Sequence, residues 1–257
     1  VGVDSITVKA LSAYWDKIGI ARHSSTRRKE LLSEYRPYIN LEEGRWPKNL
    51  KQYDSAVLCA AIAGLSDCEG NPRTSRQINV VNTTKISFDL NNSSCYVLFL
   101  SSNQVFDGLL PFRKTDDLVS PINEYGKQKA ETERNLSQIP NTTILRLTKI
   151  VYQEMGLIQN WKRDLTNGKT IFPFNDMTLS PVWLDDLTQA VSSLCICEPK
   201  KTGILHLSGD SDKSYYDFAC ELFANSLETP QKIIPSSYKN SKSVNVKIPR
   251  FTSLDMK

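Results

Sequence analysis

The 257-residue sequence lacks the features that mark several large classes of protein. No apolar run approaches the roughly 18 residues that a membrane-spanning helix needs, and the start has no signal-peptide pattern. With two histidines and six scattered cysteines, reduced buried thiols are favoured over a metal site at Cys195 and Cys197. No basic block accompanies the net charge of +4. We therefore expect a cytoplasmic protein that binds neither nucleic acid nor a membrane.

No strand pattern precedes the first helical pattern at the start of the sequence. Stretches rich in β-branched and other apolar residues alternate with helix-like stretches, which predicts a doubly wound parallel sheet of the Rossmann-like α/β class. Such a fold needs a strand and a glycine turn before its first helix, whereas Val1-Gly2 leads almost directly into a helical pattern. We interpret Gly2 as the second glycine of that turn. The predicted strands are 55–61, 95–102, 142–152 and 203–209, and the predicted helices 5–17, 72–90, 123–138 and 184–197.

A tyrosine and a lysine give the strongest chemical signal, in "SPINEYGKQKAETE" at 120–133. Tyr125 and Lys129 are four residues apart, so a helix projects both from one face. An ammonium nearby lowers the pKa of a phenol from about 10, which would let the pair transfer a proton near neutral pH. An exposed helix face without chemistry is the alternative. The pair lies about 20 residues beyond a strand that ends in Ser101-Ser102, where doubly wound folds bind ligands, and this placement favours catalysis.

Two further segments are typical of a dinucleotide site. "GIARHSSTRR" at 19–28 reads as a second strand that ends in basic residues, where an arginine accommodates the 2′-phosphate of NADP. A solvated basic turn is the alternative. The cofactor contacts expected there are Ser25, Thr26, Arg27 and Arg28. In "LCAAIAG" at 58–64, Ala60 and Ala61 are small enough to let a cofactor approach the backbone, while Asn79 would either pack a helix or support the site.

These motifs, in this order, resemble the extended short-chain dehydrogenase/reductase superfamily, and within it the dTDP-4-dehydrorhamnose reductase-like family. The likeness covers nearly the whole chain: "SSNQVFDG" at 101–108 resembles the strand-end motif, "ILRLTKIVY" the Leu-Arg strand, and "SPVWLDDLTQAV" and "GILHLSGDSDKSYYDFA" later segments. The ending "IPRFTSLDMK" is similar to a stretch that precedes a further helix. We therefore expect truncation at both ends.

The resemblance implies roles for individual residues. Ser102 would hydrogen-bond the substrate carbonyl, Tyr125 would act as general acid, and Lys129 would assist it and bind the nicotinamide ribose. Further contacts are implied to the cofactor from Ser101 and to the substrate from Asn103, Gln104, Val105 and Phe106. The implied reaction is NADPH-dependent reduction of a 4-keto group on a nucleotide-linked deoxysugar, as in dTDP-rhamnose biosynthesis.

Departures from the family pattern refine this expectation. Asn103 and Gln104 stand where sugar-nucleotide dehydratases carry an acidic pair, and amides cannot perform their elimination chemistry. Lys149 stands where the reductases often have tryptophan, which leaves the sugar open. Two alternatives remain: an epimerase that uses the same pair, and a regulatory subunit like the β-subunit of methionine adenosyltransferase, which also has Ser-Ser-Asn at this strand end. Some relatives bind magnesium or form homodimers, and no residue here requires either.

The same resemblance predicts the domain organisation. Residues 1–151 would form an NADP-binding domain, and 152–257 mostly a substrate-binding lobe, with 181–208 returning to the sheet. The partners expected are therefore a nucleotide sugar and NADPH.

Overall fold

A four-stranded parallel sheet forms the centre of the protein, as the sequence predicts. The computed structural model describes residues 5–33, 36–50, 53–224, 232–240 and 246–256. The strands follow the order β1-β2-β3-β7, and every neighbouring pair is parallel. Their bounds are β1 Ser55–Leu58, β2 Tyr96–Ser102, β3 Thr142–Leu147 and β7 Gly203–Leu207. All residues of β2 and β3 are buried, which explains their continuous apolar runs.

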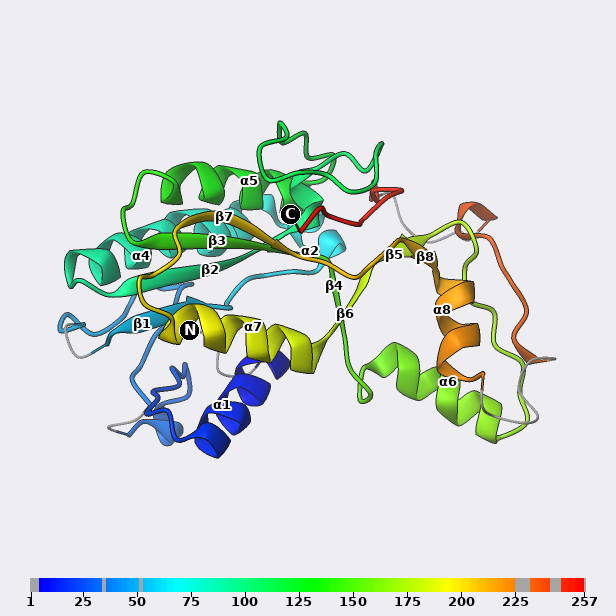
Figure 1. Cartoon of the computed structure of the whole chain (residues 1–257), viewed down its shortest axis with the longest axis horizontal. Coiled ribbons are helices and arrows are strands. Elements are labelled where there is room, and N and C mark those ends of the chain that lie inside the picture. Colours follow the sequence, from blue (N-terminus) through cyan, green and yellow to red (C-terminus); the bar gives the residue numbers. More distant parts are fainter. Residues whose placement is uncertain (1–4, 34–35, 51–52, 225–231, 241–245, 257) are drawn as a thin grey trace.

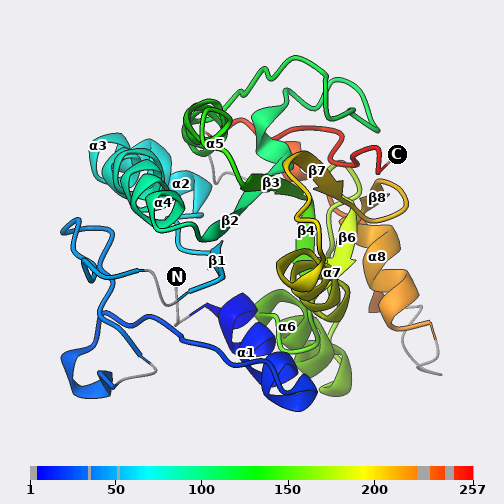
Figure 2. The same cartoon turned by 60° about the vertical axis from the view of Figure 1, so that its left-hand side comes forward.

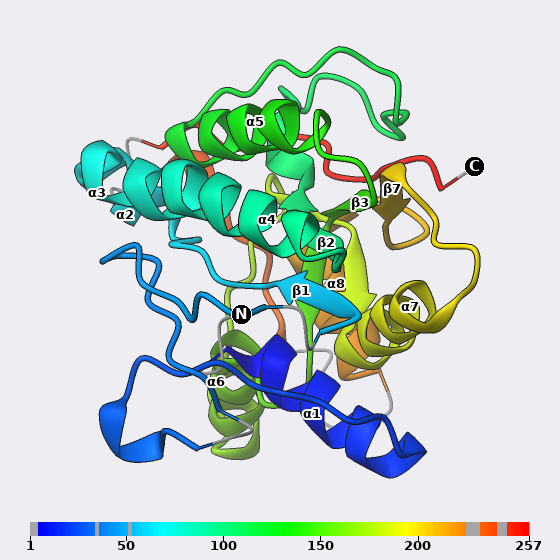
Figure 3. The ribbon, with the colours of Figure 1, turned by 90° about the vertical axis from the view of Figure 1, so that its left-hand side faces the viewer.

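Helices cover both faces of this sheet (Figure 2). On one face, α4 and α5 pack over Val97, Phe99 and Ile144, while on the other α1 and α7 pack over Leu98 and Leu145. The alternation along β2 follows from the period of two in a strand. The elements of these two layers are α1 Ile6–Ile18, α2 Leu65–Gly70, α3 Pro72–Arg76, the π-helical turn η2 Gln77–Asn82, α4 Thr83–Asn92, α5 Glu124–Leu136 and α7 Leu184–Ile196. Figure 3 shows the two helical layers on either side of the strands.

A smaller lobe has its own apolar core and lies to one side of the sheet (Figure 1). The lobe contains α6 Gly156–Thr166, α8 Tyr215–Leu222, and the antiparallel pair of β5 Thr178–Leu179 and β8 Lys213–Ser214. A parallel pair leads into it, β4 Lys149–Val151 and β6 Pro181–Trp183. Short 3-10 turns are η1 Lys29–Leu31, η3 Asn103–Val105 and η5 Tyr238–Asn240. The assignment of cofactor and substrate to separate domains stays a prediction.

The predicted strands 55–61 and 203–209 end earlier in the structure, at Leu58 and Leu207, and two other predicted strands differ in more than their bounds. The strand predicted over 142–152 breaks at Thr148, because β4 leaves the sheet to pair with β6. The prediction of a strand over 19–28 is wrong. In the described structure this segment forms a single isolated β-bridge, between Thr26 and Tyr38. Apolar and β-branched residues favour a strand only where a neighbour completes the backbone hydrogen bonds.

Candidate active site

The three predicted catalytic residues line one cavity of about 500 Å3. The cavity lies where β2 and β3 end, beside the start of α5, and the lobe supplies its far wall. Besides Ser102, Tyr125 and Lys129, the lining includes Ala61, Asn103, Gln104, Thr148, Lys149, Thr178, Tyr215 and Thr252. The carboxyl edge of a parallel sheet is the usual ligand site of a doubly wound fold. Sequence reasoning missed Thr178, Tyr215 and Thr252, because nothing near them in sequence marks the lobe wall.

Ser102 ends β2 in extended conformation and caps the turn that follows. Its hydroxyl accepts a hydrogen bond from the backbone N–H of Gln104 at 3.2 Å, and its side chain is nearly buried. The next helix approaches closely because residue 126 is glycine: a Cβ there would overlap the carbonyl oxygen of Gln104. Asn123 ties the same two segments, since its Oδ1 accepts from the N–H of Gly126 and its Nδ2 donates to Gln104 Oε1, both at 2.8 Å. These contacts hold the start of α5 against the end of β2, so that Tyr125 and Ser102 line the same cavity.

Tyr125 is held as a neutral phenol. Burial raises its pKa above the ordinary value of 10, against a smaller opposing effect of the Ser102 hydroxyl. The prediction that Lys129 lowers this pKa is therefore wrong. The ammonium lies 5.7 Å from the centroid of the Tyr125 ring and donates instead to the carbonyl oxygen of Leu100 at 2.7 Å. A protonated phenol beside a serine hydroxyl is a hydrogen-bond donor and a proton source.

Lys129 is a buried ammonium with an unusually low pKa. Burial lowers that pKa from 10.5 to about 8, and the charge of Glu133 opposes the shift. Its Nζ also lies 4.4 Å from the centroid of the Phe99 ring, where a cation is attracted to the ring face. Lys129 is therefore poised to change its charge close to physiological pH.

The residues predicted to hold the nicotinamide end differ in their placement. Ala61 lines the cavity, whereas Ala60 packs against the core below it. Ser101 borders the cavity, but its hydroxyl donates to Glu133, so its side chain is already engaged. Asn79 supports the loop that contains Ala61, because its Oδ1 accepts from the N–H of Ile62 at 2.8 Å. Its amide nitrogen donates to the Ile62 carbonyl and to Gln128 of α5.

The basic segment at 25–28 lies away from this cavity. Ser25 lines a second cavity of about 330 Å3 beside α1 and β1, and Thr26 is buried with its Oγ1 accepting from the N–H of Arg28 at 3.0 Å. Arg27 is exposed and lies 3.6 Å from Glu42. A dinucleotide has two distant ends, so separation from Tyr125 is compatible with a role at the adenosine end. Gly2 lies outside the described residues.

Two of the four predicted substrate contacts do not reach the cavity. Asn103 and Gln104 line it, but Val105 and Phe106 are buried in a small core with Ala130 and Leu254. The prediction that Val105 and Phe106 contact the substrate is therefore wrong. The sequence alone does not show whether two apolar side chains such as Val105 and Phe106 contact a ligand or pack into a core.

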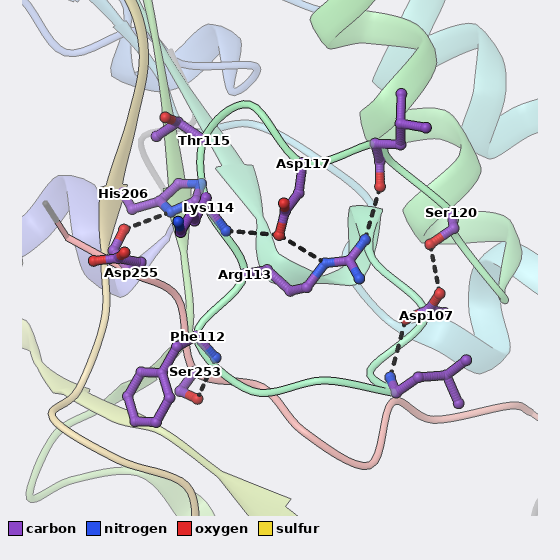
Figure 4. A network of polar contacts seen from close by, with 12 residues as sticks. Asp107, Phe112, Arg113, Lys114, Thr115, Asp117, Ser120, His206, Ser253 and Asp255 are labelled. Carbon is purple, nitrogen blue, oxygen red and sulfur yellow. Dashed lines mark hydrogen bonds and ion pairs between the residues drawn. The ribbon is translucent and has the colours of Figure 1, made fainter.

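Asp107 and Gly108, at the end of the motif 101–108, stabilise the loop that follows them (Figure 4). Asp107 accepts hydrogen bonds from the Ser120 hydroxyl at 2.7 Å and from the N–H of Leu109 at 2.9 Å, and these bonds lower its pKa. Gly108 has φ +72°, and a Cβ there would collide with Pro249. Farther along the loop Arg113 pairs with Asp117 at 3.2 Å. The Asp-Gly step thus closes the loop beside Ser102 and is structural.

Two absences can be stated for the part of the chain that the structure describes. No helix there is long and apolar enough to cross a membrane. The same residues contain no group of three or more His, Cys, Asp or Glu side chains that could hold a metal ion.

Comparisons with known proteins converge on one family. The protein-family model described as "RmlD substrate binding domain" matches residues 41–257. Methionine adenosyltransferase 2 subunit beta of Bos taurus is 24% identical over 209 residues, covering 77% of this chain and 62% of that protein. The dTDP-4-dehydrorhamnose reductase of Aggregatibacter actinomycetemcomitans is 26% identical over 174 residues, covering 65% and 59%. The chain thus spans about three-fifths of the length of these relatives.

Solved structures show the same fold. A hypothetical dTDP-4-dehydrorhamnose reductase from Sulfolobus tokodaii superposes with a TM-score of 0.83 at 23% identity, covering all of this chain and 90% of that one. The reductase from Bacillus anthracis, solved in complex with NADP, gives 0.82 at 17% identity, with 100% and 88% covered. These values confirm the predicted Rossmann-like class.

Proposed function

We propose a function for this chain on the basis that it belongs to the RmlD substrate binding domain family of the extended short-chain dehydrogenase/reductases. Relatives in this family include sugar-nucleotide reductases. The proposal is that this protein reduces a 4-keto group on a nucleotide-linked deoxysugar with NADPH. It is carried by one observation: Ser102, Tyr125 and Lys129 line the same cavity, and among its described lining residues there is no carboxylate. Elimination by a dehydratase would need such an acid.

The chain's own residues perform the proton chemistry in this proposal. NADPH, when bound, supplies the hydride to the carbonyl carbon. Small residues such as Ala61 and Ala63 beside Lys129 fit the approach of a flat nicotinamide ring. Ser102 donates to the carbonyl oxygen, and Tyr125 gives that oxygen a proton as the alkoxide forms, so ketone becomes alcohol and solvent later reprotonates the tyrosine. The Lys129 ammonium would bind the nicotinamide ribose in this proposal. NADPH oxidation by the full-length protein with dTDP-4-keto-deoxysugars tests this reaction.

A regulatory subunit is the second candidate. Methionine adenosyltransferase β-subunits match this chain at identities like those of the reductases. In that case a partner would copurify stoichiometrically, and its binding would survive Tyr125→Phe. An epimerase, the third candidate, would convert its substrate without net consumption of NADPH.

The choice between NADPH and NADH is expected to depend on Arg27. Replacing it by glutamine should weaken NADPH binding about tenfold and leave NADH unchanged, because only NADPH has the 2′-phosphate that a guanidinium pairs with. Fluorescence titration of the two cofactors measures both affinities. Arg163→Gln is the matched control, since Arg163 is also exposed and next to a carboxylate, on α6. Equal losses for NADPH and NADH would contradict the assignment.

Cofactor binding should also weaken with rising pH. The pKa of Lys129 is about 8, so between pH 7 and pH 9 the ammonium that would bind the ribose loses most of its charge, and affinity for NADPH falls about tenfold. The free energy of unfolding changes in the opposite direction. The folded pKa lies below the unfolded value of 10.5, so the unfolded state binds more protons between these values and stability increases with pH there.

The variant Lys129→Met distinguishes the effect of Lys129 titration from the effects of other groups that titrate at high pH. The NADPH affinity of Lys129→Met should not decline tenfold between pH 7 and pH 9. The unfolding free energy of the wild type minus that of Lys129→Met should increase from pH 8 to 10.5. Titrations at several pH values and urea unfolding supply the two curves. Identical curves for both proteins would contradict the role of Lys129.

A further inference from the structure

Lys149 presents an ammonium at the cavity, and no described residue pairs with it. It is the first residue of β4 and lines the cavity with Ser102 and Tyr125. Within the described residues its ammonium has neither a hydrogen-bond acceptor nor an ion-pair partner. Lys149 is exposed to solvent as a residue, and neighbouring protein atoms partly desolvate its ammonium and lower its pKa. A partly desolvated cation gains more from a bound anion than a cation in open water does.

The charges of the lining make this ammonium distinctive. Among the described lining residues only Lys129 and Lys149 are charged. Lys129 already donates to the Leu100 carbonyl and is influenced by Glu133. Lys149 is therefore the uncompensated positive charge of this part of the wall, and the remaining polar groups around it are hydroxyls and amides. Hydroxyls and amides suit neutral sugar oxygens, whereas a free ammonium favours an anionic oxygen.

Its position places that charge near the reacting carbonyl. Ser102 pairs with Leu147 in the sheet register, and Lys149 follows Leu147 by two residues, after the chain has left this sheet at Thr148. Two residues span at most about 7 Å, so the flexible four-carbon side chain of Lys149 can reach the space beside Ser102 in the cavity that both residues line. An anion that meets Lys149 would thus belong to the same bound molecule as the carbonyl at Ser102.

We propose that Lys149 is a specificity residue that binds an anionic oxygen group of the nucleotide sugar, either a carboxylate on the sugar ring or a phosphate of its diphosphate. This inference rests on the proposed function, and it assigns the substrate a charged feature that a neutral deoxysugar lacks. The carboxylate is the favoured source, because a ring carbon beside the reacting carbonyl lies closer to Ser102 than the diphosphate at the far end of the ring.

Calorimetric binding of two matched ligands tests the inference. The full-length protein, saturated with NADP, is titrated with UDP-glucuronate and UDP-glucose, and with the corresponding dTDP sugars. We expect the uronate to bind at least tenfold more tightly to the wild type. Lys149→Met should remove that preference and leave the glucose ligand and NADP unchanged, whereas Lys149→Arg should retain it. Lys162→Met, on the exposed side of α6, is the control for loss of one surface charge.

The outcomes separate the two sources and the two proposals. An equal weakening of both sugars and of UDP alone by Lys149→Met supports the phosphate as the source. Unchanged affinities in Lys149→Met overturn the inference and leave the proposed reductase intact. If NADP binds to the wild type but none of the nucleotide sugars does, the proposed function itself is overturned, and the role of Lys149 with it.

Discussion

Replacement of Tyr125 by phenylalanine is expected to lower turnover about 10²- to 10⁴-fold, the usual contribution of a positioned general acid. The phenol lines the same cavity as Ser102, and because burial raises its pKa above the ordinary value of 10, it is protonated at neutral pH. Removing its oxygen leaves the ring and its packing in place, so affinity for NADPH should stay within about twofold. Steady-state oxidation of NADPH with a 4-keto nucleotide sugar gives turnover, and cofactor fluorescence gives the affinity.

Tyr14→Phe is the matched control for this change. Tyr14 is a partly buried tyrosine of α1 that does not line the cavity, so turnover should be unaffected. A Tyr125→Phe protein with wild-type turnover would contradict the proton-donor assignment. A wild-type protein without turnover on any 4-keto sugar, but with a partner bound whether or not residue 125 has a hydroxyl, would instead favour the regulatory subunit.

The sheet and its helices were predictable because their residues repeat one pattern. Strands such as 96–102 are buried on both faces and therefore read as continuous apolar runs, and amphipathic helices such as 124–136 lie between them in the sequence. The segment 19–28 contains few apolar residues, and it finds no ladder partner in the described structure beyond Tyr38. Strand pairing is a long-range property, so composition alone does not determine it.

The grouping of Ser102, Tyr125 and Lys129 in one cavity was also predictable, from a strand end followed by a four-residue helical spacing. The direction of the Tyr125 pKa shift was not. It depends on how deeply the phenol is buried and on whether the Lys129 ammonium meets the ring or the Leu100 carbonyl, and spacing leaves both undetermined. The wall contributed by Thr178 and Tyr215 comes from a lobe whose docking no local pattern encodes.

Replacement of Arg146 by methionine should lower the free energy of unfolding by about 3–5 kcal/mol. Arg146 and Glu133 form a nearly fully buried ion pair, with Arg146 Nη2 and Glu133 Oε2 2.8 Å apart. Removing the guanidinium leaves the carboxylate buried with a hydrogen bond from Ser101 but without its countercharge. The change also removes a cation that lies 5.0 Å from the centroid of the Phe106 ring. Urea denaturation followed by circular dichroism measures the loss.

A second pair from the same helix provides the control. Arg76 contacts Glu131 of α5, but both side chains are substantially exposed, so Arg76→Met should cost no more than about 1 kcal/mol. The double variant Glu133→Leu with Arg146→Met should recover most of the stability lost in Arg146→Met, because apolar groups of similar size replace a desolvated pair. Equal losses for Arg76→Met and Arg146→Met would contradict the importance of burial.

The double variant also separates the stability of the fold from the pH response of the site. Glu133 raises the pKa of Lys129 against the larger effect of burial. Without that carboxylate the pKa of Lys129 should fall further below 8, so NADPH affinity should begin to decline at a lower pH than in the wild type. A stable variant with an unshifted pH profile would show that Glu133 serves packing alone. A shifted profile would show that the buried pair beneath the sheet edge also sets the charge of the lysine in the site.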